Sequence, residues 1–222
     1  MEEVRLIENF VSWQGEGPDS GQAMIILRFK TCNLKCPWCD TSVKMRISAE
    51  APYKISDIQT SILDNKAGIL ITGGEPTVPR HFDEAVGLLN NLKYPIANVE
   101  SNGLQLEELI QETEDSPNNI HFMYSPKFFT SVDLDLAFKK TESLLQYPNL
   151  FIKVVYEDRP MVEEYLTWLS RIITIQQANK VWLMPEGVTR ADLIRNSEAV
   201  FNVCEKYKFN FSSRSHIIFG FV

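Results

Sequence analysis

The sequence contains few histidines, few cysteines and fewer basic than acidic residues. Its 222 residues include 3 His and 4 Cys, and 22 Lys and Arg are outnumbered by 29 Asp and Glu, giving a formal charge of −7. An acidic chain attracts phosphate backbones only weakly, which disfavours a nucleic-acid partner. The few cysteines are also unevenly placed, because three of the four lie between positions 32 and 39. This clustering indicates a metal site.

Long hydrophobic runs are absent as well. No apolar stretch reaches the roughly 18 residues of a membrane helix, and the start of the chain has no basic segment followed by an apolar one. We therefore expect a cytoplasmic protein with no membrane partner. Thiols stay reduced in that compartment, so disulfides are not expected.

No linker rich in Pro, Gly or Ser divides the chain, and 44% of its residues are hydrophobic. We therefore expect a single domain over residues 1–222. The pattern predicts strands at 24–29, 68–72, 98–101, 120–125, 151–156 and 180–185, and an extended segment at 211–219. It predicts helices at 81–92, 105–112, 134–146, 161–173 and 191–207. Ser56 with Gln59 and Thr189 with Asp192 fit helix-capping pairs.

This alternation of strands and helices predicts a parallel sheet with helical crossovers. A chain of 222 residues is short for a complete eightfold barrel. The predicted fold class is therefore α/β, a partial TIM-like barrel of parallel strands with outer helices. Reactive groups should collect at the C-terminal ends of its strands.

The cysteine motif C-x3-C-x2-C directly follows the first of these strands. Cys32, Cys36 and Cys39 lie in the loop 30–41. Three thiolates on one loop suit a [4Fe–4S] cluster whose fourth iron is open to another ligand. A structural zinc site is the alternative, although it normally takes four protein ligands. The remaining cysteine, Cys204, lies far along the chain in a predicted helix, where we expect a core residue.

A second motif, Gly73-Gly74-Glu75-Pro76, ends the strand 68–72. Glycines at a strand end allow a ligand to approach the backbone, and Glu75 can accept a hydrogen bond from an ammonium group. Taken alone, this segment also fits an ordinary turn.

The cysteine motif, with Trp38 before its last cysteine, resembles that of the radical S-adenosylmethionine (SAM) superfamily. The resemblance implies that the open iron binds the amino and carboxylate groups of SAM, and that cleavage of SAM yields a 5′-deoxyadenosyl radical. The Gly-Gly-Glu-Pro segment resembles the part of these enzymes that holds the methionine amine.

Three further segments narrow the resemblance. They are 13–17 (Trp-Gln-Gly-Glu-Gly), Asp40-Thr41 and 213–216 (Ser-Arg-Ser-His). In this order they resemble the 7-carboxy-7-deazaguanine synthase family, over about residues 8–222. The resemblance implies a carbon–nitrogen lyase that contracts 6-carboxy-5,6,7,8-tetrahydropterin to 7-carboxy-7-deazaguanine with loss of ammonia, in 7-deazapurine (queuosine/preQ0-type) biosynthesis. It also implies Mg²⁺, a flavodoxin- or ferredoxin-type electron donor and a homodimer.

The same resemblance assigns site residues. The implied cofactor-binding positions are Gly73, Gly74, Glu75, Glu100, Ser101, Ser125, Pro126, Lys127, Met184, Pro185, Glu186 and Gly187. The implied substrate-binding positions are Trp13, Gln14, Gly15, Glu16, Arg28, Thr72, His216 and Val222. Thr41, with Asp40 beside it, is implied as the Mg²⁺ ligand. No side chain is expected to act in catalysis beyond placing the cofactors.

Two of these implied roles carry a physical reason. The guanidinium of Arg28 suits a bidentate contact with the substrate carboxylate. Val222 would act through its α-carboxylate, in a tail at 210–222 that closes over the substrate.

Several alternatives stay open at this point. Trp13 fits either stacking on the pterin or core packing, and Asp40-Thr41 also fits a simple turn cap. For the whole chain, the alternatives are a glycyl-radical-enzyme activase of the same superfamily and a non-catalytic zinc-binding interaction module.

Overall fold

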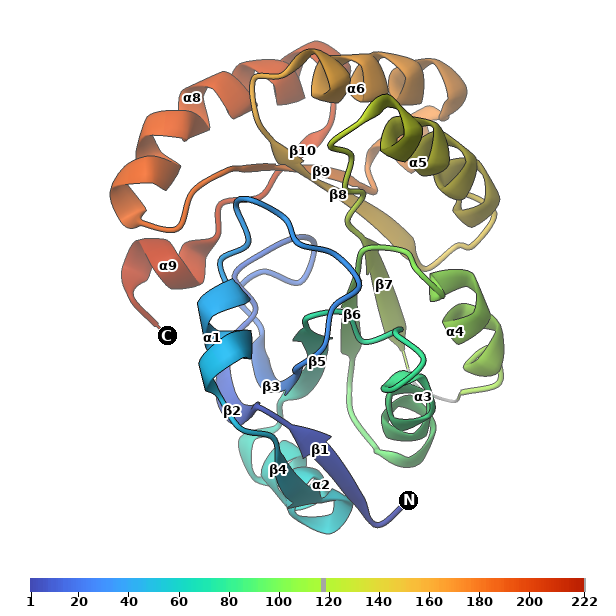
Figure 1. Cartoon of the computed structure of the whole chain (residues 1–222), viewed down its shortest axis with the longest axis vertical. Helices are drawn as coiled ribbons and strands as arrows, with labels where there is room; N and C mark the ends of the chain where they lie inside the picture. Colours follow the sequence, from blue (N-terminus) through green and yellow to red (C-terminus); the bar gives the residue numbers. More distant parts are fainter. Residues whose placement is uncertain (117–118, 222) are drawn as a thin grey trace. The chain divides into compact units, whose positions relative to one another are not determined.

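The computed structural model describes residues 1–116 and 119–221, in which strands and helices alternate along the chain (Figure 1). The chain forms two compact units. The first unit comprises Met1–Gln14 and Gly21–Met123, and the second comprises Gly15–Ser20 and the described residues from Tyr124 onward. The expectation of a single domain stays a prediction.

The first unit is built on a mostly parallel sheet. Its strands are β2 (Glu8–Trp13), β3 (Ala23–Phe29), β5 (Gly68–Gly73), β6 (Ala97–Ser101) and β7 (Ile120–Tyr124), in the spatial order β2-β3-β5-β6-β7. β2 runs antiparallel to β3, whereas β3, β5 and β6 are parallel. β1 (Glu3–Leu6) and β4 (Ala51–Lys54) form a separate antiparallel pair. The central strands β3 and β5 contain the uninterrupted apolar runs Met24–Leu27 and Ile69–Ile71, as expected for parallel strands that are covered on both faces.

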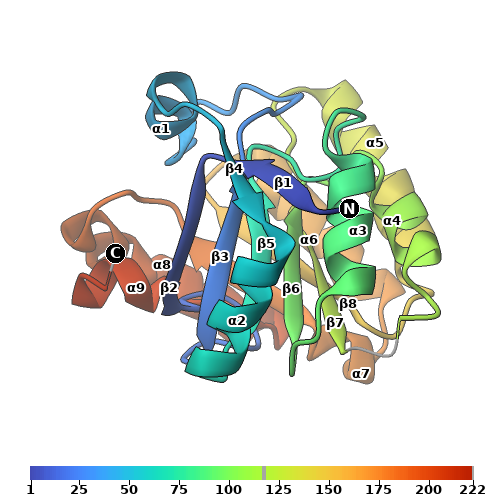
Figure 2. The same ribbon diagram turned by 90° about the horizontal axis from the view of Figure 1, so that it is seen from below.

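The described residues of this unit form the helices α1 (Ser42–Ile47), α2 (Ile55–Asn65), α3 (Phe82–Asn91) and α4 (Leu106–Glu112). Figure 2 shows α2 and α3 beside the strands of the sheet. Ile58 and Ile62 of α2 are buried, as are three apolar residues of α3. The apolar faces of these helices therefore contribute to the core.

Within its described residues, the second unit contains the parallel strands β8 (Leu150–Tyr156), β9 (Val181–Pro185) and β10 (Asn210–Phe211). Its helices are α5 (Ser131–Leu144), α6 (Pro160–Ile172), α7 (Ile175–Ala178), α8 (Arg190–Tyr207) and α9 (Ser215–Phe219). An aromatic cluster forms part of the core, with Tyr165 fully buried between Phe128, Phe138 and Trp168. The Tyr165 hydroxyl lies 2.7 Å from the Thr141 hydroxyl, so its polar end is satisfied.

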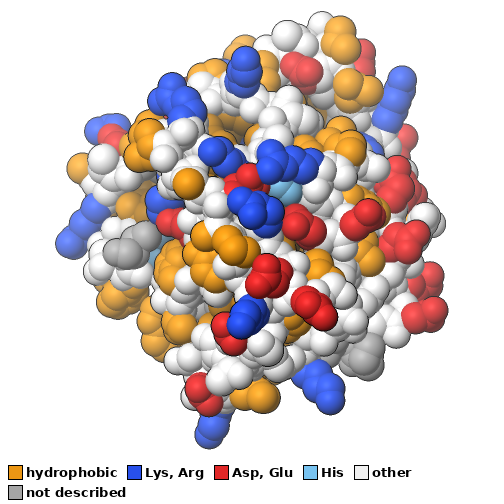
Figure 3. All heavy atoms as spheres, turned by 60° about the horizontal axis from the view of Figure 1, so that its bottom comes forward, with side chains coloured by type: hydrophobic (Ala, Val, Ile, Leu, Met, Phe, Trp, Pro, Cys, Tyr) orange, Lys and Arg blue, Asp and Glu red, His pale blue; other side chains and the backbone are white. Residues whose placement is uncertain are grey.

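The predicted α/β class is confirmed, because mostly parallel strands alternate with helices. Among the described residues β2 and β10 each have one neighbouring strand, so the strands do not close, as expected of a partial barrel. Along the described ranges, none of the helices has both the length and the apolar character needed to cross a bilayer. Acidic and basic side chains lie interspersed on the face that Figure 3 shows.

Two local predictions are wrong. Residues 211–219 are not extended, because the left-handed backbone of Arg214 (φ 53°) turns the chain into α9. Ser56 and Gln59 do not form a capping pair, because α2 already begins at Ile55 and the Gln59 side chain bonds the backbone of Lys93. The predicted cap at Thr189 is confirmed, since its hydroxyl accepts a hydrogen bond from the Asp192 N–H.

Candidate active site

The cysteine loop begins where β3 ends, and its start is fixed by a buried histidine. His81 stacks on Phe29 with ring centroids 4.7 Å apart, and its Nε2 accepts a hydrogen bond from the Thr31 N–H (3.3 Å). Sequence reasoning missed this role, because His81 lies 50 residues beyond Thr31 in the chain. The loop that carries the thiols is therefore anchored to the sheet at its first residues.

The three thiols of this loop are each partly exposed. The Cys39 N–H donates to the Cys36 carbonyl (3.2 Å), and the Leu34 N–H donates to Cys32 Sγ (3.4 Å). Hydrogen bonds to sulfur help to hold thiolates and tune the clusters that they bind. Three thiols on one loop supply the number of ligands that a [4Fe–4S] cluster with one open iron takes, and the role of Cys32, Cys36 and Cys39 as its ligands stays a prediction. Within the described ranges, no three His, Cys, Asp or Glu side chains converge on a single metal-ion position.

The Gly-Gly-Glu-Pro segment is bonded to the start of the cysteine loop. The Gly74 N–H donates to the Phe29 carbonyl (3.0 Å), and the Glu75 N–H donates to the Thr31 carbonyl (2.8 Å). A Cβ on Gly73 would lie 2.2 Å from the Phe29 oxygen, and one on Gly74 would lie 2.3 Å from the Thr31 oxygen. Both positions therefore require glycine, because the backbone of Phe29 and Thr31 packs directly against them. The role of this segment in cofactor binding stays a prediction.

Glu75 is a buried carboxylate that accepts three hydrogen bonds on Oε1 and one on Oε2. Its Oε1 accepts hydrogen bonds from the Ser101 hydroxyl (2.7 Å) and from the hydroxyl and N–H of Thr77 (2.7 and 3.1 Å). Its Oε2 accepts one from the Asn102 N–H (2.6 Å). Burial raises the pKa of Glu75, and these hydrogen bonds oppose that shift. Asn102 also donates to the Asn33 side chain (2.9 Å), so one residue joins Glu75 to the cysteine loop.

Arg28 lies beside Thr72 in the parallel register of β3 and β5, and its side chain is anchored at one end. Its Nε lies 2.5 Å from Glu8 Oε2, while Lys44 Nζ lies 2.5 Å from Glu8 Oε1. Burial alone would raise the pKa of Glu8, but the two cations lower it. Because the Glu8 bond uses Nε, the Nη groups keep the geometry for a bidentate carboxylate contact.

Asp40 and Thr41 lie between the cysteine loop and α1. Thr41 is the residue before the helix, yet in the described chain its side chain makes no capping bond. Its hydroxyl lies 3.5 Å from Cys39 Sγ instead, and Asp40 is exposed. The side-chain-cap alternative is therefore not supported, and the Mg²⁺ role stays a prediction.

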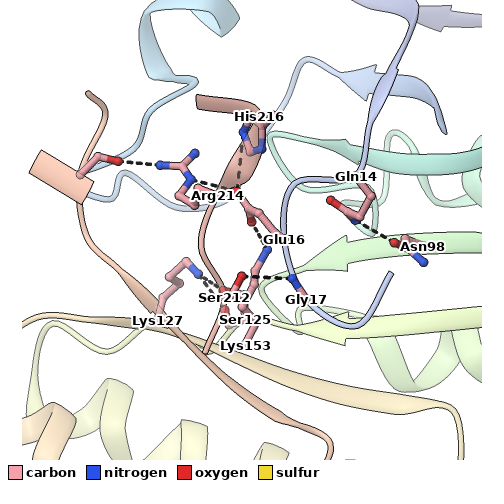
Figure 4. Close-up of polar contacts among 11 residues, drawn as sticks. Gln14, Glu16, Gly17, Asn98, Ser125, Lys127, Lys153, Ser212, Arg214 and His216 are labelled. Atoms are coloured by element: carbon pink, nitrogen blue, oxygen red, sulfur yellow. Dashed lines mark hydrogen bonds and ion pairs between the residues drawn. The ribbon is translucent and has the colours of Figure 1, made fainter. Parts of the chain in front are cut away.

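The N-terminal turn places Gln14 firmly. Gln14 is buried, and its Nε2 donates to Asn98 Oδ1 at 2.7 Å (Figure 4). Its backbone is paired with Gln22 (2.8 Å) and Gly21 (2.7 Å). Asn98 was missed, although a polar residue in an apolar strand was a usable signal. Trp13 is 51% exposed, which makes the core-packing alternative wrong.

In the second unit, Glu16 is surrounded by cations (Figure 4). Its carboxylate lies 2.5 Å from Lys153 Nζ, 2.9 Å from Arg214 Nε and 3.9 Å from His216 Nε2. Burial alone would raise the pKa of Glu16, but the positive charges of Lys153 and Arg214, with a smaller contribution from His216 when it is protonated, hold it well below its usual range. Sequence reasoning missed Lys153, although a lysine in the middle of the apolar strand β8 is unusual.

Gly15 and His216 lie directly against each other in this unit. A Cβ on Gly15 would lie 1.8 Å from His216 Nδ1, and the Ser215 N–H donates to the Gly15 carbonyl (2.9 Å). The structure thus brings together three of the predicted substrate residues: Gly15, Glu16 and His216. Val222 lies outside the described residues, so its predicted role is not addressed.

The other predicted cofactor positions lie at strand ends, as expected. Glu100 and Ser101 end β6, Ser125–Lys127 directly follow β7, and 184–187 span the end of β9. Lys127 Nζ donates to the Ser125 carbonyl (3.0 Å) and to its hydroxyl. The Gly187 carbonyl accepts a hydrogen bond from Arg214 Nη1 (2.7 Å). Their contacts with a cofactor stay predictions.

Cys204 is 5% exposed, in α8. The prediction that Cys204 is a buried core residue is confirmed.

Comparisons with known proteins agree with this geometry. The model of the radical SAM superfamily matches residues 26–130. The chain is 26% identical to the 7-carboxy-7-deazaguanine synthase of Hyperthermus butylicus, over 97% of this chain and 92% of that one. It is 37% identical to the enzyme of the same name from Neisseria meningitidis, over 46% of each chain. The crystal structure of QueE from Escherichia coli superposes with a TM-score of 0.56 at 18% identity, covering 94% of this chain and 92% of that one.

The chain is therefore similar to the radical SAM superfamily in three respects: its parallel fold, its cysteine loop bonded to the Gly-Gly-Glu-Pro segment, and the family model that matches residues 26–130. The cofactors of that superfamily are a [4Fe–4S] cluster and SAM. Within it, the chain resembles the 7-carboxy-7-deazaguanine synthases.

Proposed function

We propose that the chain contracts 6-carboxy-5,6,7,8-tetrahydropterin to 7-carboxy-7-deazaguanine, with loss of ammonia, in 7-deazapurine biosynthesis. The observation that carries the proposal is the junction of two motifs: the glycine turn of Glu75 is hydrogen-bonded to the start of the cysteine loop. Relatives that align with nearly the whole chain bear the name of this enzyme. Their names favour this reaction over the other reactions of radical SAM enzymes.

On the cofactor side, the chain provides ligands and a fixed acceptor. Cys32, Cys36 and Cys39 would hold the cluster, and Glu75 would receive the methionine amine. When bound, the cluster and SAM supply the radical that removes hydrogen from the pterin. Because Glu75 is already held by four donor groups, it needs no rearrangement to receive an ammonium group.

On the substrate side, Arg28 is the candidate for the pterin carboxylate. Its Nε is held by Glu8, so the guanidinium is oriented before substrate arrives, and the entropy cost of binding falls. Thr72, next to Arg28 in register, and Gln14, fixed by Asn98, supply polar groups for the ring system. Trp13 and the tail of Val222 remain predicted contacts.

Further parts of the proposal rest on the family resemblance. Thr41, with Asp40 nearby, would supply a protein oxygen to Mg²⁺, which keeps much of its water shell. A homodimer, a cytoplasmic location and a flavodoxin- or ferredoxin-type electron donor complete the proposal.

Product identification tests the reaction. The protein is reconstituted anaerobically with iron and sulfide, reduced, and given SAM and the carboxylated tetrahydropterin. Formation of 7-carboxy-7-deazaguanine with release of ammonia is the expected result. Cleavage of SAM without this product would favour an activase. Metal analysis of the protein before reconstitution tests the other alternative, because one zinc per chain with no sulfide would favour the interaction module.

A matched pair of cysteine variants tests the cluster assignment. Cys36→Ala should abolish cluster assembly, measured as iron and acid-labile sulfide. Cys204→Ala should leave the cluster intact, because this thiol is a core residue of the second unit. Loss of sulfide in the Cys204 variant would overturn the ligand assignment.

A further inference from the structure

Glu16 belongs to a loop that resembles a substrate-contacting turn, yet its carboxylate is already engaged by protein cations. Lys153 donates a hydrogen bond to Glu16 Oε2, and Arg214 donates one to Oε1. His216 Nε2 lies 3.9 Å from the same Oε1 atom. The side chains of Lys153 and Arg214 are only 5% and 8% exposed. A carboxylate in this position compensates buried charge rather than presenting a vacant acceptor.

The contacts of Glu16 tie two distant segments together. Lys153 belongs to β8 and lies 137 residues from Glu16, whereas Arg214 lies 198 residues away, just before α9. Glu16 therefore joins the C-terminal segment 212–221 to a strand of the sheet through the loop Gly15–Ser20. Figure 4 shows the side chains converging on this one carboxylate.

Two backbone contacts reinforce the same junction. The Gly17 N–H donates to the Ser212 hydroxyl (3.1 Å), and the Ser215 N–H donates to the Gly15 carbonyl (2.9 Å). Both flank the Glu16–Arg214 pair in sequence. The loop and the segment 212–221 are thus bonded at successive positions, with the ion pair at the centre.

The backbone of Arg214 indicates that the ion pair holds it in place. Its φ of 53° is a left-handed conformation that costs energy for a residue with a side chain. The guanidinium bonds both Glu16 and the Gly187 carbonyl (2.7 Å), and these bonds offset that cost. This strained residue immediately precedes α9, so its conformation sets the direction of the helix that carries His216.

We infer that Glu16 is a positioning residue that clamps the segment 212–221 onto the loop Gly15–Ser20 and so fixes His216 for substrate binding. The clamp itself is a property of the second unit. Its effect on the substrate rests on the proposed function.

The test replaces Glu16 by its neutral isostere. In Glu16→Gln, amide hydrogen exchange of residues 212–221 should accelerate roughly 10- to 100-fold, the factor for losing a hydrogen bond to a charged group. KM for the pterin should rise, whereas cluster content and kcat at saturating substrate should change little. Glu163→Gln is the matched control, because Glu163 also bonds a lysine, Lys206, in the same unit, yet its side chain is 43% exposed.

The outcomes separate the clamp from the reaction. Unchanged exchange in the segment overturns the inference, and a raised KM with unchanged exchange shows a direct substrate contact instead. If the wild-type protein forms no product, the exchange experiment still decides the clamp. If Glu16→Gln fails to fold, Arg214→Gln gives the same readout, because it leaves the Glu16–Lys153 pair in place.

Discussion

Gly15→Ala should displace α9 while the rest of the second unit stays folded. The added Cβ would lie 1.8 Å from His216 Nδ1, 2.7 Å from its Cγ and 2.9 Å from its backbone nitrogen. Ordinary contact begins at 3.4 Å, so the ring must retreat by about 1.6 Å, the difference between 3.4 and 1.8 Å. Because the backbone is also too close, a new His216 rotamer does not relieve the clash.

The size of the effect follows from the way α9 is held, which is by the contacts around Glu16 rather than by buried side chains of its own. Overpacking typically costs about 1–3 kcal/mol, and α9 has no buried residue among its described positions. Such a helix opens locally at low cost. A free-energy change of about 1.4 kcal/mol alters an equilibrium constant tenfold, so the clash should raise the equilibrium constant for local opening of α9 by about 5- to 150-fold.

Amide hydrogen exchange of residues 215–219 is the direct assay. Ser20→Ala, at an exposed position of the same loop, is the control and should leave exchange unchanged. The double variant Gly15→Ala/His216→Ala removes the two ring contacts and should recover part of the protection. Wild-type exchange in Gly15→Ala would refute the steric reasoning.

Three further outcomes are expected. Burial raises the pKa of Cys204 to about 11 from 9.0, so stability should fall between those two pH values, where the unfolded thiol ionises first; Cys204→Ala should flatten that decline in urea titrations. Glu8→Gln should raise KM for the pterin several-fold with unchanged iron content, because Arg28 loses its charged anchor. Tyr165→Phe should lower the free energy of unfolding by about 1–3 kcal/mol in urea denaturation, since it removes the hydrogen bond to the buried Thr141 hydroxyl.

Much of the first unit could be predicted from sequence. Runs such as Met24–Leu27 and Ile69–Ile71 are apolar without interruption, and the cysteine and glycine motifs follow them at the strand ends. The requirement for glycine at 73 and 74 was also readable, because a cofactor motif there implies close backbone approach. Its full cause, the contact with Phe29 and Thr31, needed coordinates.

The ion cluster of the second unit was not predictable in the same way. Glu16, Lys153 and Arg214 are far apart in the chain, and a single sequence does not reveal which distant charges pair. The predicted capping pair of Ser56 and Gln59 was wrong because a tertiary contact replaced it. The Gln59 side chain bonds the backbone of Lys93 rather than capping its own helix. Lys153, a lysine within the apolar strand β8, was the signal in the sequence that could have predicted a buried acidic partner.

The path of the chain between the two units has a consequence for dissecting the protein. The polypeptide passes from one unit to the other after Gln14, after Ser20 and after Met123. A fragment ending at Met123 would carry the carboxylate of Glu16 away from Lys153 and Arg214, and the complementary piece would keep two cations with no counter-ion. The complementary piece is therefore not an independent folding module, and its segment 212–221 should become ordered only when the fragment that carries Glu16 is added.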